Sequence, residues 1–194
     1  MAAEGMKRAV RTPEERTALV ELVDAAGHAT GTLGKLEAHH PPGQLHRAVS
    51  VFLLDGSDRL LIQRRAADKY HSAGLWSNTC CGHPMPGEQP SAAASRRLLI
   101  ELGLRVAPEE LVAADTVTYE VGDPASGLVE REYNHLFVGR TVDEPLLNAS
   151  EVAEIRAVTL ADLLADPTDW SEFTAWWPIV LRAAMPGLWS LLTE

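Results

Sequence analysis

Residues 82–104 read GHPMPGEQPSAAASRRLLIELGL, and the fold prediction starts from them. The second part of this stretch, residues 91–102 (SAAASRRLLIEL), is predicted to form a helix. Ser91 is a suitable cap for its N-terminus, and Gly103 is typical of the residue that ends a helix. The glycines and prolines before Ser91 belong to a longer predicted loop at residues 66–90. The stretch therefore predicts a loop that leads into a central helix.

Strand-like segments lie on both sides of this helix. Those before it are residues 17–24, 46–54 and 59–64, and those after it are residues 111–121, 128–139 and 152–159. The second and third segments are joined by a hairpin signal at residues 55–58 (DGSD), and the fourth and fifth by a turn at residues 122–125 (GDPA).

Two further helices are predicted at the end of the chain, at residues 160–165 and at residues 171–192, the latter interrupted by Pro178 and Pro186. Strands, one central helix, more strands and final helices indicate a single α+β domain, with a mixed sheet flanked by helices. We expect this domain to span residues 18–194, after a flexible polar lead-in at residues 1–17.

Composition excludes several classes of protein. The apolar fraction is 46% and the charged fraction 23%, which is ordinary for a globular domain. A net charge of −10 argues against binding to nucleic acid or to an anionic membrane surface. No apolar run is long enough to span a membrane, and the first residues do not resemble a secretory signal. Residues 1–100 nevertheless hold 12 of the basic side chains and residues 101–194 only 5, so the cations are concentrated in the first half.

The two cysteines, Cys80 and Cys81, are adjacent, and a bridge between neighbouring cysteines is strained. There is no other cysteine with which either could pair, so no disulfide framework is expected. We therefore expect a cytoplasmic protein in a reducing compartment.

The opening stretch resembles the Nudix box, G-x5-E-x7-R-E-U-x-E-E-x-G-U, where U is a bulky aliphatic residue. Gly82, Glu88 and the segment Arg96–Leu104 keep its spacing over the full length. Arg97 and Ile100 stand where the pattern has glutamates, and those carboxylates help Nudix hydrolases to hold divalent ions. The resemblance thus implies a Nudix-like fold, with Glu101 as the single helix carboxylate.

Four other segments resemble the type I isopentenyl diphosphate isomerases, a branch of the same superfamily, and occur in that family's order. They are residues 31–35 (GTLGK) followed by His39 and His46, residues 76–84 (WSNTCCGHP), residues 127–132 (GLVERE) and residues 173–176 (FTAW). The resemblance implies reversible interconversion of isopentenyl diphosphate and dimethylallyl diphosphate through a tertiary carbocation, in isoprenoid precursor biosynthesis.

The resemblance also implies roles for individual residues. The implied catalytic residues are Cys81, Glu132, Tyr119 and Trp176, with Trp176 facing the cation. The implied diphosphate-binding residues are Lys35, Arg65, Lys69 and Arg97. Glu101 would bind a second ion, Mg²⁺, that bridges to the diphosphate. Arg64 and Arg96 are expected to be solvated surface charges. Because water would trap the cation, the pocket must be dry, and acid/base groups are needed on two sides of the substrate.

The residues themselves also point to a metal site. Three imidazoles (His39, His46 and His83) and two carboxylates (Glu130 and Glu132) are available, and residues two apart on a strand share a face. This N/O set suits an octahedral ion such as Mn²⁺ or Mg²⁺, whereas Zn²⁺ more usually takes four ligands and ranks second. Any single histidine can instead be an ordinary hydrogen-bonded side chain, as expected for His28, His40, His71 and His135.

Alternatives remain open at this stage. Cys81 can be a small buried hydrophobe, and Trp176 can belong to a core of Trp170, Trp177 and Trp189. A Nudix hydrolase of nucleoside or other diphosphates is the rival activity, although it needs carboxylates at Arg97 and Ile100. A silent Nudix module that binds a nucleotide or a protein is the rival of another class. We expect a small diphosphate substrate and no flavin, nicotinamide or obligatory protein partner.

Overall fold

The fold was analysed in a computed structural model, which describes residues 18–165 and 170–193. Nine strands form one sheet. They are β1 (Leu19–Val23), β2 (Ala29–Gly34), β3 (His46–Leu54), β4 (Leu60–Arg65), β5 (Trp76–Ser77), β6 (Cys80–Gly82), β7 (Val112–Gly122), β8 (Val129–Arg140) and β9 (Val152–Val158). The helices among the described residues are α2 (Lys35–His39), α3 (Pro90–Leu102), α4 (Leu160–Leu164), α5 (Trp177–Thr193) and a short 3-10 turn, η1 (Pro108–Glu110).

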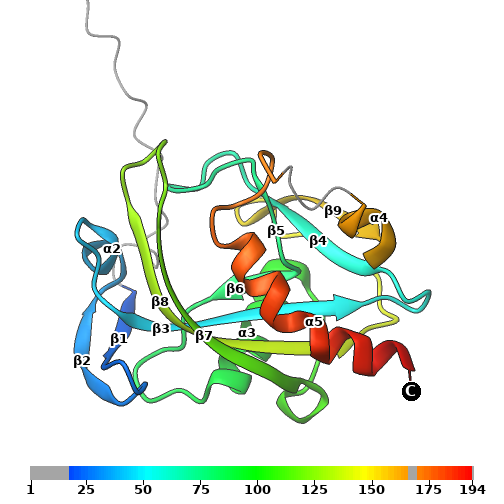
Figure 1. Cartoon of the computed structure of the whole chain (residues 1–194), viewed down its shortest axis with the longest axis horizontal. Coiled ribbons are helices and arrows are strands. Elements are labelled where there is room, and N and C mark those ends of the chain that lie inside the picture. The colour runs from blue at the N-terminus through cyan, green and yellow to red at the C-terminus, as the bar shows by residue number, and fades with distance from the viewer. Residues whose placement is uncertain (1–17, 166–169, 194) are drawn as a thin grey trace, which may run out of the picture.

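Strand β3 is the centre of the sheet (Figure 1). It pairs in parallel with β8 over nine residue pairs, from His46 opposite Glu132 to Leu54 opposite Arg140. It pairs antiparallel with β6, and β7 extends the sheet beyond β8 in an antiparallel hairpin. Because parallel and antiparallel pairs coexist, the sheet is mixed, and the expected α+β arrangement is confirmed.

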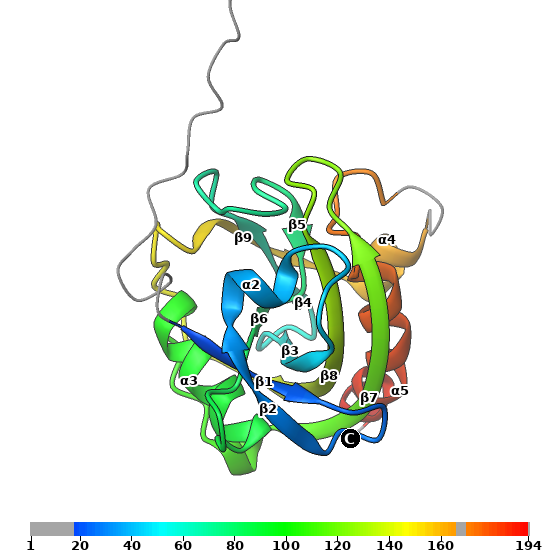
Figure 2. The same ribbon diagram turned by 90° about the vertical axis from the view of Figure 1, so that its left-hand side faces the viewer.

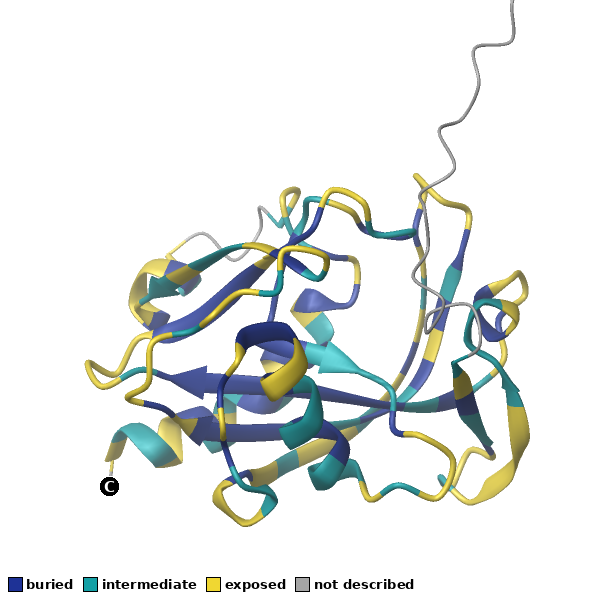
Figure 3. Cartoon of the chain, turned by 180° about the vertical axis from the view of Figure 1, so that it is seen from behind, coloured by how far each residue is buried: buried dark blue, intermediate teal, exposed yellow. Residues whose placement is uncertain are grey.

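The two longest helices cover opposite faces of the central strands, with α3 and α5 on either side in the turned view (Figure 2). Side chains on β3 alternate accordingly, since successive strand residues point to opposite faces. Val51 and Leu53 pack in the cluster that includes Leu98 of α3, while Phe52 and Leu54 pack in the cluster that includes Trp177 of α5. Burial is therefore concentrated along the central strands, and exposed residues gather in turns and outer edges (Figure 3).

Helix α3 agrees with the prediction except at its start. It ends at Leu102, and Gly103 follows in the left-handed conformation (φ 65°), as expected for a helix stop. The helix begins at Pro90, however, and the residue at the cap position is Gln89, so the assignment of Ser91 as the cap is wrong. Proline suits the first helical position because its φ is already fixed and its missing N–H is not needed there.

The predicted hairpin at residues 55–58 exists, but its strands soon separate. The registered pair between β3 and β4 is Leu54 opposite Leu60, after which β4 pairs with β9 and β5. The turn at residues 122–125 does join two long paired strands, β7 and β8, as predicted. Local turn signals thus located the chain reversals correctly, whereas the partners of each strand depend on distant segments.

Other differences lie in short or irregular segments. The predicted loop at residues 66–90 contains β5 and β6, and β2 and α2 were not predicted. Helix α5 begins at Trp177, so the prediction of helix from residue 171 is wrong: Phe173 instead forms a bridge with Trp76 of β5. Pro178 is tolerated in the first turn, and α5 continues past Pro186.

The predicted lead-in at residues 1–17 lies outside the described residues. Its flexibility and the domain boundary at residue 18 remain predictions. Among the described segments, no helix has the length and apolar character needed to cross a membrane.

Candidate active site

A cavity of about 690 Å³ opens beside the central strands. Eleven of the thirteen predicted site residues line it directly, and the other two belong to the His/Glu cluster at its wall. Those at the wall are Lys35, Arg65, Lys69, Cys81, His83, Arg97, Glu101, Tyr119, Glu130, Glu132 and Trp176. His39 and His46 do not line the cavity, because both are fully buried behind His83 in one cluster.

The cluster consists of His39, His46, His83, Glu130 and Glu132, whose candidate ligand atoms all lie within 4.8 Å of one another. The Nε2 atoms of His46 and His83 are 3.1 Å apart, and Nε2 of His83 is 3.1 Å from Oε1 of Glu132. Nε2 of His39 lies 3.0 Å from Oε2 of Glu130. The parts of the chain that supply these atoms are α2, β3, β8 and the residue that follows β6.

The hydrogen bonds behind two of the imidazoles set their tautomer. Nδ1 of His39 lies 2.6 Å from the carbonyl oxygen of Lys35, and Nδ1 of His46 lies 2.7 Å from that of Gln44. A carbonyl only accepts, so each Nδ1 carries a proton, and Nε2 of the neutral ring presents a lone pair to the cluster. Burial would lower the pKa of His39, but the Glu130 carboxylate that faces its Nε2 outweighs burial and raises the pKa. This is the arrangement found in metal-binding histidines, where the second ring nitrogen is held by an oxygen acceptor.

The protonation states of the cluster residues also bear on metal binding. Burial lowers the pKa of His46 and lowers that of His83 well below the usual range, so both imidazoles are neutral at pH 7. Burial alone would raise the pKa of Glu130, but the imidazoles of His71 and His39 outweigh it and the carboxyl stays ionised. Nε2 of His39 and Oε1 of Glu130 are buried without a well-aligned hydrogen-bond partner among the described residues. The neutral imidazoles of His46 and His83, the imidazole of His39 in its neutral form and the two carboxylates can hold a divalent metal ion.

The two adjacent cysteines have different surroundings. Both are on β6, where successive residues face opposite sides of the sheet. Cys80 is fully buried in the cluster beneath α3, whereas Cys81 lines the cavity 3.8 Å from Nη1 of Arg65. Burial raises the pKa of the Cys81 thiol to about 12, even though Arg65 acts in the opposite direction. Cys81 is therefore a protonated thiol at the cavity wall.

Tyr119, Glu132 and Asn134 form a hydrogen-bonded group on β7 and β8. The hydroxyl of Tyr119 donates to Oε2 of Glu132, and burial raises the pKa of that hydroxyl well above its usual range. The side-chain amide of Asn134 donates to the same carboxylate oxygen at 3.0 Å and to the Tyr119 oxygen at 2.9 Å. Asn134 was not predicted, although it shares a strand face with Glu132 two residues earlier.

Two cations and two carboxylates form another part of the cavity wall, which we call the cationic wall: Lys69, Arg97, Glu101 and Glu151. The Arg97 guanidinium donates to Oε1 of Glu101 at 2.7 Å and to Oε2 of Glu151 at 3.1 Å. Nζ of Lys69 lies 2.6 Å from the same Oε2 of Glu151. The other Glu101 oxygen accepts a hydrogen bond from Gln63 at 2.9 Å. The prediction missed Glu151 and Gln63.

Arg65 lies between several cavity residues. Its guanidinium carbon is 5.5 Å from the ring centre of Trp176, a distance at which a cation interacts with an indole face. Trp176 lines the cavity and also belongs to the buried cluster that contains Trp177, against which Trp170 packs, whereas Trp189 is half exposed.

Arg64 and Arg96 were both expected to be surface charges, but their surroundings differ. The side chain of Arg64 is 50% exposed and donates to the carbonyl of Gly74. Arg96 is more enclosed than expected, since it lines the cavity and donates twice to Glu88 at 2.7 Å. Glu88 thereby orients the loop before α3, because its carboxylate also accepts from the backbone N–H of Met85.

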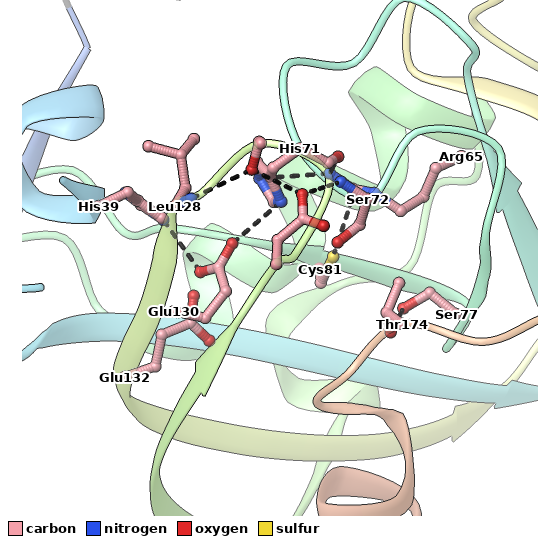
Figure 4. Close-up of polar contacts among 12 residues, drawn as sticks. His39, Arg65, His71, Ser72, Ser77, Cys81, Leu128, Glu130, Glu132 and Thr174 are labelled. Carbon is pink, nitrogen blue, oxygen red and sulfur yellow. Dashed lines mark hydrogen bonds and ion pairs between the residues drawn. The ribbon is translucent and has the colours of Figure 1, made fainter. Parts of the chain in front are cut away.

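His71 was expected to be an ordinary histidine, but it lies at the cavity. It is only 7% exposed, and its Nδ1 is 3.1 Å from Oε1 of Glu130. Burial lowers its pKa well below the usual range, so the ring is neutral at pH 7. Figure 4 shows the imidazole between Glu130 and Arg65. Its segment is irregular, and no periodic pattern in the sequence places it at the site.

Comparison with known proteins identifies the class of this domain. The NUDIX domain family matches residues 44–176. The structure of a Deinococcus radiodurans protein superposes with a TM-score of 0.69, at 17% identity over 86% of this chain and 98% of the other. A MutT protein from Methanosarcina mazei gives a TM-score of 0.59, at 18% identity over 77% of this chain and 96% of the other. The fold is a Nudix fold, as predicted.

Sequence relatives narrow this class. The isopentenyl-diphosphate Delta-isomerase of Streptomyces griseus is 56% identical over 170 residues, which cover 88% of this chain and 85% of the relative. The enzyme of the same name from Pectobacterium atrosepticum is 42% identical, covering 88% of this chain and 92% of the relative. The chain belongs to the isopentenyl-diphosphate Delta-isomerase family.

Proposed function

We propose that the protein interconverts isopentenyl diphosphate and dimethylallyl diphosphate, with Cys81 and Glu132 as its two acid/base groups. The observation that carries this proposal is a protonated thiol and a carboxylate at the wall of one cavity, in a chain of this family. The thiol comes from β6 and the carboxylate from β8. Moving a double bond by one position requires a proton donor and a proton acceptor, because one carbon gains a proton and another loses one.

The proton balance is simple. In the forward direction a proton is added to the terminal methylene, which gives a cation at the tertiary carbon. A proton is then lost from the carbon next to the one that bears the diphosphate. The reaction is reversible, so the group that acts as an acid in one direction acts as a base in the other. The hydroxyl of Tyr119 and the amide of Asn134, which both donate to Glu132, hold its carboxylate in place.

The cation between these steps must be protected from water. Trp176 is 4% exposed and lines the cavity, and we assign its indole face to the cation. An interaction of this kind contributes about 2 kcal/mol when it is desolvated.

We assign the diphosphate to Lys35, Arg65, Lys69 and Arg97, which share the cavity wall. Arg97 and Lys69 now donate to the carboxylates of Glu101 and Glu151. Guanidinium and ammonium groups bind phosphate oxygens by the same type of charge-assisted hydrogen bond. Diphosphate binding thus exchanges one set of anionic partners for another, which leaves Glu101 available to a Mg²⁺ ion that accompanies the substrate.

We assign a divalent ion, Mn²⁺ or Mg²⁺, to His39, His46, His83, Glu130 and Glu132. When bound, it would supply a fixed positive charge beside the Glu132 carboxylate and lower its proton affinity. Both cysteines are free, which suits a reducing cytoplasm, and we assign the reaction to that compartment.

The test is incubation with isopentenyl diphosphate and Mn²⁺ or Mg²⁺ in D₂O. Deuterium in an allylic product without release of phosphate is expected. Phosphate release would instead indicate a hydrolase, and absence of both label and turnover at high enzyme concentration would refute the proposal.

Substitutions test the two assigned groups separately. Cys81→Ala and Glu132→Gln should each lower kcat by about 10²–10⁴-fold or more, because a positioned acid or base contributes a rate factor of that size. Circular dichroism should show the same fold in both variants. A rate near that of the unmodified protein in either variant would contradict the role assigned to that residue.

A further inference from the structure

His71 lies at the cavity wall between two groups that the proposed function uses separately. It belongs to the loop between β4 and β5, outside the five-residue metal cluster, and is 7% exposed. On one side it faces Glu130, and on the other it faces Arg65 (Figure 4). Glu130 belongs to the proposed metal site, and Arg65 to the proposed diphosphate site.

The chemistry of its neighbours determines which ring nitrogen carries the proton. Nη2 of Arg65 lies 3.3 Å from Nε2 of His71, and a guanidinium can only donate, so Nε2 must be the acceptor. In a neutral imidazole the proton then lies on Nδ1, which is 3.1 Å from Oε1 of Glu130. The alignment of this second contact is poor, but the acceptor recorded near Nδ1 among the described residues is the Glu130 carboxylate. A single imidazole thus accepts from Arg65 and faces Glu130 with its N–H.

The carboxylate of Glu130 connects His71 to the metal cluster. Its Oε2 is 3.0 Å from Nε2 of His39, while its Oε1 faces His71. The two oxygens therefore have separate roles, and a change at His71 acts on the oxygen that is directed away from His39. Partners of this kind behind a metal-binding group orient it, and removing one typically weakens metal binding about 10–100-fold.

Arg65 connects His71 to the reacting end of the cavity. Its Nη2 donates also to the backbone carbonyl of His71 at 3.2 Å, so this residue receives two contacts from the same nitrogen. The other guanidinium nitrogen, Nη1, is 3.8 Å from Sγ of Cys81. Fixing one edge of the planar guanidinium fixes the direction of the other edge.

The loop that carries His71 is itself tied to the sheet. The next residue, Ser72, has a φ of 48°, and its N–H donates to Oδ2 of Asp123 at 2.9 Å. Asp123 is 8% exposed and lies at the turn between β7 and β8, the hairpin that also carries Glu130. His71 is therefore held by the same hairpin as the carboxylate it faces.

We infer that His71 is a positioning residue that couples the metal site to the diphosphate site by orienting Glu130 and Arg65 together. This inference rests on the proposed function for the identity of the two ligands. The ring nitrogens of His71, and not merely the volume of its side chain, produce this coupling. Neither the metal cluster nor the set of predicted cationic residues includes His71.

The test compares His71→Phe with His71→Gln. Phenylalanine keeps a ring but has no donor or acceptor, whereas a glutamine amide can donate to Glu130 and accept from Arg65. Mn²⁺ affinity is measured from the electron paramagnetic resonance signal of free Mn²⁺, and affinity for inorganic diphosphate by calorimetry on the Mn²⁺-loaded protein. His28→Gln is the control, because His28 is exposed and its ring pairs with Asp24 on the protein surface.

His71→Phe should weaken Mn²⁺ binding by about 10-fold or more and should also weaken diphosphate binding. His71→Gln should recover most of both affinities. If His71→Phe does not fold, His71→Leu replaces it. Unchanged affinities in the apolar variant, or equal losses in the apolar and glutamine variants, would overturn the inference. Because neither measurement needs turnover, failure of the isomerase assay with the unmodified protein is a separate result.

Discussion

The two charged regions of the cavity are built in opposite ways. In the His/Glu cluster, acceptor atoms face one another, and Nε2 of His39 and Oε1 of Glu130 have no well-aligned partner in the part of the chain that the structure describes. In the cationic wall, Lys69 and Arg97 each donate to a carboxylate. The cluster thus has acceptor atoms that a cation could bind, whereas Lys69 and Arg97 are already paired and would have to exchange partners. The difference supports the proposals that the cluster binds a resident ion and that the other region receives a ligand that comes and goes.

The largest expected effect concerns the cluster. Glu130→Gln removes a negative charge from the group of proposed ligands, and an amide is a weaker ligand for a divalent ion. Mn²⁺ binding should weaken by more than the roughly 10–100-fold that follows from loss of an outer partner.

The matched control is Glu120→Gln, since Glu120 is an exposed glutamate on the adjacent strand β7. Equilibrium dialysis against Mn²⁺ measures both variants. If the Glu130 variant binds Mn²⁺ as the control does, the cluster does not depend on this carboxylate.

The cationic wall should respond in the opposite direction. Glu151→Gln removes the anion that now competes with diphosphate for Lys69 and Arg97. Affinity for inorganic diphosphate should rise about tenfold, which corresponds to about 1.4 kcal/mol. Calorimetry measures it, and Glu154→Gln, at an exposed carboxylate, is the control. Weaker binding in the Glu151 variant would mean that the carboxylate orients the cations instead of competing for them.

The pKa of Glu151 predicts that the stability of the protein depends on pH. Burial would raise the pKa of Glu151, but Arg97 and Lys69 outweigh it and lower the pKa below the ordinary value of 4.5. A carboxyl whose pKa is lower in the folded state stabilises the protein above its unfolded pKa and loses that contribution as the pH falls through its folded pKa.

Glu151→Gln should therefore cost about 1–2 kcal/mol of unfolding free energy at pH 7. The difference from the unmodified protein should shrink below pH 4.5, the ordinary value for glutamate. Urea unfolding at a series of pH values measures it. A difference that stays constant down to pH 3 would contradict the ionic origin of the contribution.

The smallest effect is expected at Arg64, next to a cavity residue but outside the cavity. Its side chain is 50% exposed, and successive residues of β4 point to opposite faces. Arg64→Ala should change stability by less than about 0.5 kcal/mol and leave KM unchanged. Arg65→Ala in the same kinetic assay should raise KM. A similar rise in both variants would show that the cationic wall extends to Arg64.

The sequence predicted those parts of the site that lie on regular elements. Glu130 and Glu132 are two residues apart on a strand, so their common face follows from the period of the strand. The stop of α3 at Gly103 likewise follows from local conformational preference.

The unpredicted parts depend on distant contacts. His71 lies in an irregular loop that is held by a hydrogen bond from Ser72 to Asp123, 51 positions further along the chain. Glu151 follows no pattern that distinguishes it from other surface glutamates, and it is recognised only because Lys69 and Arg97 converge on it. The separation of β4 from β3 after one residue pair has the same origin, since β6 pairs with β3 and β5 with β4, while β9 pairs along the other edge of β4.

The parallel pairing of β3 with β8 has a consequence for folding. His46 lies opposite Glu132, although 86 positions separate the two residues in the chain. A shift of this register by one residue would turn every side chain of β8 to the other face of the sheet. Both glutamates would leave the cluster together, and of its five residues only the three histidines would remain. If the cluster binds a metal ion as proposed, metal affinity reports whether these two strands have met in the correct alignment, and a misregistered chain would be recognisable as one that has folded its helices but binds the ion weakly.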